Sequence, residues 1–497
     1  MKTAQAIHDF IQLAIQNGSS TLMDKIYLEN KVLAFIGEHS MQPITQTISN
    51  QPLELLDILI ETARKNEVIQ TTTDQEILKA QLMDILTPMP SQINQAFKDL
   101  LKKDSQQATN YFHNLSKKNN YIQTRAISKN IHYLHETKYG AIEITINLSK
   151  PEKDPKEIAQ AKFVKEMNYP TCQLCMENEG YLGRVNYPAR SNHRIIRLDL
   201  NEEQWGVQYS PYAYFNEHSI VLNTKHIPMK IDQRTFDNLF AFVDKFPHYM
   251  VGSNADLPIV GGSILTHDHY QAGNHEFPMA KAKVRKVVTL HAFKNITTTI
   301  LDWPMSVLRL QGENKSDLVH ASLFILDKWK NYSDESVQIV AKTADSIEHH
   351  TITPIVRKRE SVYEIVLVLR DNNVSIEHPD GIFHPHKEVQ HIKQENIGLI
   401  EVMGLAILPP RLKTELMEVE KYLLKEENTI CAIHLSWANE LKETNEITKE
   451  NVHRIVEKGV GEKFLQVLSH AGVFKDTNEG HLAFERFISF LNEFGKN

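Results

Sequence analysis

Apolar residues recur every three or four positions through the first part of the chain, as on the buried face of an amphipathic helix. In the N-terminal stretch, Ile7, Phe10, Ile11 and Ala14 follow this spacing. Prolines separate further segments with the same periodicity, in TLMDKIYLENKVLAFIGE, PLELLDILIETARK, DQEILKAQLMDIL and QINQAFKDLLKK. The pattern predicts a helical extension over residues 1–135.

Beyond this extension the apolar period changes to two. AIEITINL (141–148) alternates apolar and polar residues, which predicts a half-buried strand. Residues 232–246 and a stretch near 316–330 have helical spacing, and PEKDPKEIAQAKFVKE is expected to be a charged helical connector. Other strands are expected in NHRIIRLDL, EQWGVQYS, HSIVLN, KVVTLHAF (286–293), SVLRL and YEIVLVLR, with extended runs at 255–273 and 396–410.

The order of these elements predicts an α+β fold built from two similar halves with mainly antiparallel sheets. We expect the helical N-terminal extension to be followed by a first half at 136–300, a second half at 301–430 and a helical C-terminal tail at 431–497. No fixed-period repeat is visible in the sequence.

Composition narrows the class of protein. The 497 residues carry 55 Lys+Arg against 62 Asp+Glu, a net charge of −7, which argues against a general nucleic-acid binder. No apolar run is long enough to span a membrane, and the N-terminus lacks the unbroken apolar core of a secretion signal. Only three cysteines occur, too few for a disulfide framework. These features predict a reduced, cytoplasmic protein.

The segment HDHYQ (267–271) is the first candidate for chemistry. In a strand, His267, His269 and Gln271 share one face, and Asp268 and Tyr270 share the other. An imidazole can attack phosphorus, and a carboxamide can donate to a phosphoryl oxygen. The pattern therefore indicates a phosphate-handling site, although histidine pairs on exposed strands are common.

Three residues just upstream fit the same chemistry. Gly261-Gly262 permits a close approach of the backbone to a ligand, and Ser263 can hold phosphate oxygens through its hydroxyl or amide.

Cys172-Gln-Leu-Cys175 is the second candidate. Two cysteines at this spacing form half of a tetrahedral zinc site, and His226 and His267 are candidates for the other ligands. A redox dithiol is the rival interpretation, but no strand leads into a helix here as in thioredoxin-like folds. Two incidental thiols are the remaining alternative.

A second histidine pair, His384-Pro385-His386, resembles a nucleophile motif but lacks its surroundings. No glycine pair precedes it, and Glu388 stands where a glutamine would follow. We interpret this segment as a structural or substrate-edge element.

Taken together, these motifs resemble the galactose-1-phosphate uridylyltransferases of the histidine triad superfamily. The CxxC pair, the HSIVLN strand, the amphipathic helix and the HxHxQ string occur in that family's order, with HDHYQ in place of its usual His-Pro-His-Gly-Gln. The segments YPARSNHRII, SPYAYFNEHSIVLN, GGSILTHDHYQAG and GLAILPPRL are similar to the bacterial class II branch. The resemblance implies two histidine-triad-like halves.

The resemblance also implies a reaction. UMP would pass from UDP-glucose to galactose 1-phosphate by a ping-pong mechanism through a uridylyl-His269 intermediate, as in the Leloir pathway of galactose metabolism. Gln271 would bind a phosphoryl oxygen, and His267 would be a zinc ligand or would order the loop. Cys172, Cys175 and His226 would complete the zinc site.

Substrate contacts and assembly are further implications of the resemblance. Phosphate binding by Arg184, Arg190 or Arg194, and by Asn254, matches the family by rough position, and Arg190 and Asn254 are our candidates beside Gly262 and Ser263. Family members are commonly homodimers, and the expected partners are UDP-glucose, UDP-galactose and hexose 1-phosphates, with no nucleic acid and no membrane.

Two other functions stay open on the sequence alone. One is a nucleotide hydrolase or phosphorylase that uses the same nucleotidyl-histidine step. The other is a zinc-stabilised protein that binds nucleotide sugars without turnover.

Overall fold

The computed structural model describes residues 2–149, 167–262, 264–343 and 346–494. The expected helical connector at 151–166 and Ser263 lie outside the described residues. The chain divides into two compact units. The first comprises Met1–Ser128, Ser149–Ala213 and Glu217–His226, and the second Lys129–Leu148, Tyr214–Asn216 and Ile227–Asn497.

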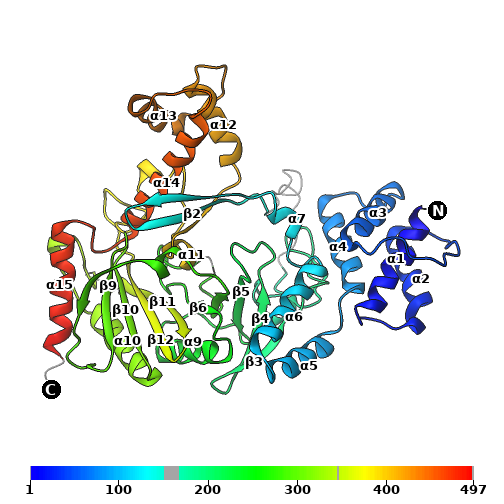
Figure 1. The fold of residues 1–497 in the computed structure, drawn as a ribbon, viewed down its shortest axis with the longest axis horizontal. Coiled ribbons are helices and arrows are strands. Elements are labelled where there is room, and N and C mark those ends of the chain that lie inside the picture. The colour runs from blue at the N-terminus through cyan, green and yellow to red at the C-terminus, as the bar shows by residue number, and fades with distance from the viewer. Residues whose placement is uncertain (1, 150–166, 263, 344–345, 495–497) are drawn as a thin grey trace. The chain divides into compact units, whose positions relative to one another are not determined.

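The first unit begins with a group of helices (Figure 1). They are α1 (Lys2–Gln16), η1 (Leu22–Asp24), α2 (Lys25–Ile36), α3 (Pro52–Lys65), α4 (Thr72–Ile85), α5 (Pro90–Leu101), α6 (Ser105–Lys118) and α7 (Thr124–Ile127). The predicted apolar spacing forms their core, in which Phe10, Val32 and Leu59 are fully buried. At the start of α4, Thr71 accepts a hydrogen bond from the Asp74 amide and caps the helix.

The same unit carries a short antiparallel meander. After η2 (Met176–Asn178), the strands β3 (Ile196–Leu200), β4 (Glu203–Tyr209) and β5 (Ser219–Asn223) pair in sequence order. Trp205 of β4 faces Leu198 on one side and Asn223 on the other. These strands confirm the predictions for NHRIIRLDL, EQWGVQYS and HSIVLN.

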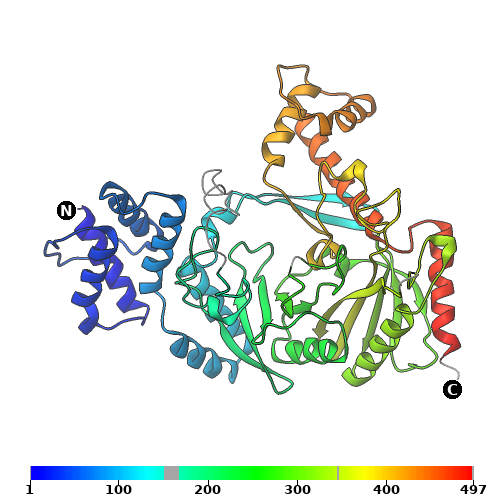
Figure 2. The same ribbon diagram turned by 180° about the vertical axis from the view of Figure 1, so that it is seen from behind.

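The second unit is built on an antiparallel sheet whose strands run in the order β7-β6-β11-β12-β10-β9-β8. Helices α9 and α10 pack on one face of it, as Figures 1 and 2 show from opposite sides. The bounds are α9 (Gln233–Lys245), β6 (Met250–Gly252), β7 (His269–Gly273), η3 (Pro278–Lys281), β8 (Val284–Val288), β9 (Thr297–Leu301), β10 (Val307–Gly312), α10 (Lys315–Trp329), η4 (Glu335–Val337), β11 (His350–Arg359) and β12 (Val362–Asp371).

A smaller sheet and the C-terminal helices complete the second unit. Strands β1 (Ile131–Thr137) and β2 (Gly140–Ile146) form a hairpin, and β13 (Leu405–Leu408) pairs parallel to β2. Ile142, Ile144 and Phe464 share one apolar cluster. The remaining elements are η5 (Lys387–Val389), α11 (Leu399–Val402), α12 (Leu412–Leu423), α13 (Ala432–Thr444), α14 (Val452–Ala471) and α15 (Asn478–Glu493).

The observed fold confirms the α+β class with mainly antiparallel strands and a helical tail. Four local predictions are wrong. The expected extended run at 396–410 is interrupted by helix α11, Leu399–Val402. Residues 131–137 form a strand rather than the end of the helical extension, β8 ends at Val288 rather than at residue 293, and regular strand within 255–273 begins only at His269. Among the described residues, no helix is long and apolar enough to cross a bilayer.

Candidate active site and metal centre

The HDHYQ segment lies at the start of β7. Asp268 and Tyr270 both face helix α9, where Asp268 pairs with Arg234 at 2.6 Å and the Tyr270 hydroxyl accepts a hydrogen bond from Asn238 at 3.3 Å. Because side chains alternate along a strand, His269 and Gln271 face the opposite side. The contacts of Asp268 and Tyr270 agree with the predicted alternation.

The imidazole of His269 is held in one orientation. Its Nδ1 lies 2.7 Å from the carbonyl oxygen of His267. A carbonyl oxygen can only accept a hydrogen bond, so Nδ1 carries the proton and Nε2 keeps a lone pair. The side chain is 6% exposed, and burial lowers the pKa of His269 to about 4. The ring is therefore neutral near pH 7 and presents Nε2 as a nucleophile.

A buried ion pair adjoins this histidine. Asp268 is 1% exposed and lies between His267 and His269 in the sequence, so its carboxylate needs a counter-charge. Arg234, in the first turn of α9, supplies it. The sequence analysis did not identify Arg234. The sequence does contain one indication of such a partner. Asp268 is a carboxylate in a segment that otherwise suits phosphate binding, so a nearby positive charge could have been expected.

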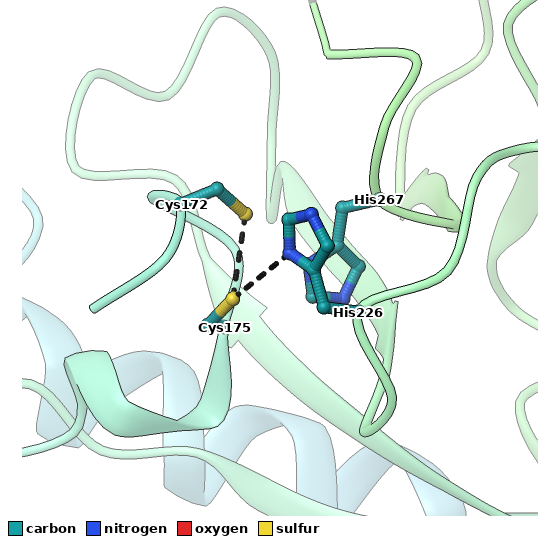
Figure 3. A group of neighbouring side chains, drawn as sticks. All are labelled: Cys172, Cys175, His226 and His267. Carbon is teal, nitrogen blue, oxygen red and sulfur yellow. Dashed lines mark hydrogen bonds between the residues drawn. The ribbon is translucent and has the colours of Figure 1, made fainter. Parts of the chain in front are cut away.

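The two cysteines of the CxxC pair lie beside two histidines (Figure 3). The Cys172 and Cys175 sulfurs are 3.5 Å apart, and the Cys175 sulfur lies 3.2 Å from Nδ1 of His226. With His267, each of these residues offers one ligand atom, and all four atoms lie within 4.8 Å of one another. These are the four residues that the sequence predicted as ligands, and they form a possible metal-binding cluster.

A polar residue fixes the turn that carries the cysteines. Nδ2 of Asn178 donates to the carbonyl oxygens of both Cys172 and Cys175 at 2.8 Å, and its Oδ1 accepts from the Tyr187 hydroxyl at 2.9 Å. Such contacts from outside a ligand set hold the ligands in place before a metal binds.

The chemistry of the donors fits a soft or borderline cation. Burial raises the pKa of the Cys175 thiol to about 12, so a metal ion must displace its proton to bind there. Two sulfurs and two imidazole nitrogens form a donor set that is typical of tetrahedral sites.

Arg190, Asn254 and Gly262, which the sequence suggested as substrate contacts, each lie close to other protein groups. Arg190 is buried, donates to the Tyr121 hydroxyl at 2.6 Å, and has no hydrogen-bond partner at Nε among the described residues. Oδ1 of Asn254 accepts from the Leu399 amide at 2.8 Å. A Cβ at Gly262 would lie 2.6 Å from Nδ2 of Asn254, so a larger residue here would displace the Asn254 side chain.

The two other arginines considered for phosphate binding are engaged inside the protein. Arg194 pairs with Asp84 at 2.7 Å and donates to the carbonyl oxygen of Pro88. Arg184 donates to the Tyr181 hydroxyl and packs its guanidinium 4.6 Å from the centre of the Tyr187 ring. These contacts account for both side chains without a ligand.

Comparisons with known proteins cover nearly the whole chain. The sequence model described as "Galactose-1-phosphate uridyl transferase, N-terminal domain" matches residues 18–228, and its C-terminal counterpart matches residues 242–439. A galactose-1-phosphate uridylyltransferase of Lactococcus lactis subsp. lactis is 57% identical over 99% of this chain and 100% of its own. One from Enterococcus faecalis is 54% identical over 99% of each chain.

Among solved structures, a yeast Ap4A phosphorylase, Apa2, matches 52% of this chain and 80% of its own at 14% identity. The TM-score of this match is 0.27.

Proposed function

The chain belongs to the galactose-1-phosphate uridyl transferase family, and on that basis we propose that it is a UDP-glucose–hexose-1-phosphate uridylyltransferase. It transfers UMP from UDP-glucose to galactose 1-phosphate and yields glucose 1-phosphate and UDP-galactose. The observation that carries the residue assignment is the neutral, oriented imidazole of His269.

The transfer consists of two in-line displacements at the α-phosphorus. In the first, the Nε2 lone pair of His269 forms a bond to phosphorus, and the bond to the glucose 1-phosphate oxygen breaks. In the second, a phosphate oxygen of galactose 1-phosphate forms the new bond, and the bond from phosphorus to Nε2 breaks. Neither step needs a proton to move on His269.

The carbonyl of His267 supports the intermediate. Once uridylylated, the ring of His269 carries a positive charge, because both nitrogens are then substituted. The carbonyl oxygen that accepts from Nδ1 at 2.7 Å stabilises this charge. The contact therefore serves both to orient the nucleophile and to lower the energy of the intermediate.

Other side chains bind the substrate in this proposal. Gln271 shares the face of His269 and donates to a nonbridging phosphoryl oxygen. Gly262 leaves space for the backbone to approach a phosphate, beside Asn254, and Ser263 and Arg190 contribute further contacts. Support comes from the buried Nε of Arg190, which has no hydrogen-bond partner among the described residues.

The metal-binding cluster holds zinc in this proposal. Cys172, Cys175, His226 and His267 would ligate it, because two thiolates and two imidazoles form a donor set typical of structural zinc. The ion would supply fixed geometry rather than a reacting group. Through His267 it would fix the residue whose carbonyl orients the nucleophile.

Composition and family membership also indicate where the enzyme is located and how it assembles. We propose a cytoplasmic homodimer that acts on small sugar nucleotides. A net charge of −7 and three cysteines that form no disulfide support this assignment over a nucleic-acid binder or a secreted protein.

The test is intact-protein mass spectrometry after mixing with UDP-glucose alone, kept at neutral or alkaline pH because phosphoramidates are acid-labile. We expect a uridylyl adduct that maps to His269 and is discharged by galactose 1-phosphate. H269A should form none, whereas H291A, which changes an exposed histidine, should behave as wild type. A protein that binds UDP-glucose but gains no uridylyl group would contradict the covalent mechanism. An adduct that is removed by water or by inorganic phosphate, without galactose 1-phosphate, would favour a hydrolase or phosphorylase.

A further inference from the structure

Arg370 of β12 is a buried cation that has no role in the reaction steps described above. Its side chain is 1% exposed and is among the largest fully buried side chains of the described residues. Burial lowers the pKa of Arg370 to about 10, so the guanidinium still carries its positive charge at neutral pH. A charge held away from water lowers the stability of a fold unless an opposite charge pairs with it.

The hydrogen bonds of Arg370 go to neutral groups. Nη2 donates to the carbonyl oxygen of Ile397 at 2.9 Å, and Nη1 donates to Oγ1 of Thr353 at 3.4 Å. Nε has no hydrogen-bond partner among the described residues. The carboxylate of Glu401 favours the charged form of Arg370, but Glu401 already forms an ion pair with Lys393 at 3.1 Å. The protein itself therefore neutralises the charge of Arg370 only in part.

Arg370 lies on the same face of the sheet as the candidate active site. Because side chains alternate along a strand, Arg370 and Val366 point to one face of β12. On this face, the cross-strand neighbours of Val366 in β11, β6 and β7 are Ile355, Gly252 and Gln271. The guanidinium is therefore on the face that carries Gln271 and the nucleophile, opposite helix α9.

A series of contacts connects Arg370 with the residues proposed to bind phosphate. Ile397, whose carbonyl oxygen accepts from Arg370, is two residues before Leu399. The Leu399 amide donates to Oδ1 of Asn254 at 2.8 Å. Asn254 in turn lies against Gly262. One short peptide segment thus separates the buried charge from the proposed phosphate contacts.

We propose that Arg370 is a positioning residue whose fixed positive charge attracts the phosphate groups of the nucleotide sugar to Asn254 and Gly262. The substrate then supplies the negative charge that the protein lacks at this point. Because Arg370 is shielded from water, its charge acts over a longer distance than that of an exposed side chain. This inference rests on the proposed function and adds to it a residue that acts on the substrate through the segment at Ile397.

Ligands of different charge provide the test. Isothermal titration calorimetry measures their binding to H269A, in which UDP-glucose binds without reacting. Adding R370Q, which removes the charge but can still donate to the Ile397 carbonyl oxygen, should weaken the binding of UMP and UDP-glucose about tenfold. The affinity for uridine, which has no phosphate, should not change.

Two further substitutions at the same position separate charge from shape. R370M is a second neutral variant and should lose the same affinity as R370Q. R370K keeps the charge and should bind UDP-glucose nearly as well as H269A alone. The difference between R370Q and H269A alone should persist at high ionic strength, because salt screens a buried charge much less than an exposed one.

R357M is the matched control. Arg357 is buried on the neighbouring strand β11, but it pairs with the buried carboxylate of Glu364, which also pairs with Arg309. R357M should lower the melting temperature, because it deprives this carboxylate of one of its two arginines, and should leave the affinity for UDP-glucose unchanged. R370Q should melt closer to wild type than R357M does, since it leaves no carboxylate without its ion pair.

Each outcome supports or overturns a specific claim. Equal losses of affinity for uridine, UMP and UDP-glucose, or no loss for any of them, would overturn the role of Arg370. So would R370K that binds as weakly as R370Q, or a failure of both neutral variants to fold. If phosphate-dependent binding is lost as expected but wild type gains no uridylyl group from UDP-glucose, the proposed covalent transfer is contradicted and the role of Arg370 in binding is not.

Discussion

At the scale of single residues, the ion pair between Asp268 and Arg234 should contribute more to stability than an ordinary surface salt bridge does. Asp268 is 1% exposed and Arg234 about one third exposed, so removing the arginine leaves a buried charge without its partner. We expect R234Q to lower the free energy of unfolding by about 2 kcal/mol, which is below the cost for a fully buried pair. Urea denaturation followed by circular dichroism measures it.

The double variant provides the control for that prediction. R234Q/D268N removes both charges and should recover most of the lost stability, because two neutral amides can hydrogen-bond in their place. A double variant no more stable than R234Q would show that Arg234 acts through other contacts. R234K, which keeps the charge, should lie between wild type and R234Q.

The residues of the site were predictable to different degrees. The cysteine spacing points to metal binding because two cysteines at this spacing form half of a tetrahedral site, and Cys172, Cys175, His226 and His267 do lie together. Arg234 could not be found, since its role depends on α9 packing beside β7. The tautomer of His269 could not be predicted from the sequence either, because it depends on a contact with the backbone carbonyl of His267.

At the scale of elements, periodicity succeeds where one face of an element is exposed. The helices α3, α9 and α10 lie where apolar spacing predicted them, because each buries a single stripe. Strand β11, His350–Arg359, escaped detection since nearly all of it is buried on both faces. Its polar residues are paired inside the sheet, for example Arg357 with Glu364 at 3.1 Å, so the sequence shows no alternation.

Helix α14 depends on a close approach to strand β1. A Cβ at Gly461 would lie 2.2 Å from Cγ of His135, which is itself buried. Alanine raises helix propensity by about 1 kcal/mol, but the clash should outweigh this, and we expect G461A to lower the melting temperature and to cost about 1–3 kcal/mol overall. Differential scanning calorimetry tests it.

Two further variants check the physical reason. H135A/G461A removes the ring that the methyl group meets and should be more stable than the sum of the single effects. K458A, at an exposed position of the same helix, should change stability by less than about 0.5 kcal/mol. A stabilised G461A would contradict the steric argument.

Asp476 joins several elements of the second unit. Its carboxylate accepts hydrogen bonds from Lys138 and Tyr139 at the β1–β2 turn, both at 2.5 Å, from Arg285 of β8 at 3.1 Å and from His481 of α15 at 2.7 Å. Burial alone would raise the pKa of Asp476, but the hydrogen bonds from Lys138, Tyr139 and His481 outweigh it and hold the pKa far below its ordinary value.

This pKa sets the sign of a pH-dependent stability. The folded state keeps Asp476 ionised at a pH where the unfolded chain, with a carboxyl pKa of about 3.9, binds a proton. Its contribution is therefore complete above about pH 5 and is lost as the pH falls toward the folded pKa. D476N should cost about 2–4 kcal/mol at pH 7 and progressively less below pH 4.

The measurement is urea unfolding at several pH values. D327N, at a carboxylate with 66% exposure, should show little difference from wild type at any pH. A cost of D476N that stays constant down to pH 3 would mean that it comes from lost packing rather than from ionisation.

At the scale of the whole molecule, the sequence predicted the class of fold and the reaction through motifs that occur far apart. The CxxC pair and HDHYQ are almost one hundred residues apart, yet their ligand atoms gather in one cluster. Such closeness depends on chain topology, which local periodicity does not contain. It became predictable only because the order of motifs resembles that of a family with the same architecture.

The two-step reaction makes a prediction about the complete enzyme. A covalent intermediate lets the first half-reaction run backward without any galactose 1-phosphate, because uridylyl-His269 can be attacked by glucose 1-phosphate as readily as it was formed. Radiolabelled glucose 1-phosphate should therefore enter UDP-glucose at a rate close to that of turnover.

The same measurement tests the nucleophile and the alternative of direct transfer. H269A should lose exchange at least about 10³-fold, as expected when a covalent nucleophile is removed, while H291A exchanges as wild type. Two inversions give net retention at phosphorus, so a chiral α-thio analogue of UDP-glucose should yield UDP-galactose of unchanged configuration. Inversion, or exchange that appears only when galactose 1-phosphate is added, would mean that the two sugar phosphates meet in one complex and that His269 does not carry the UMP.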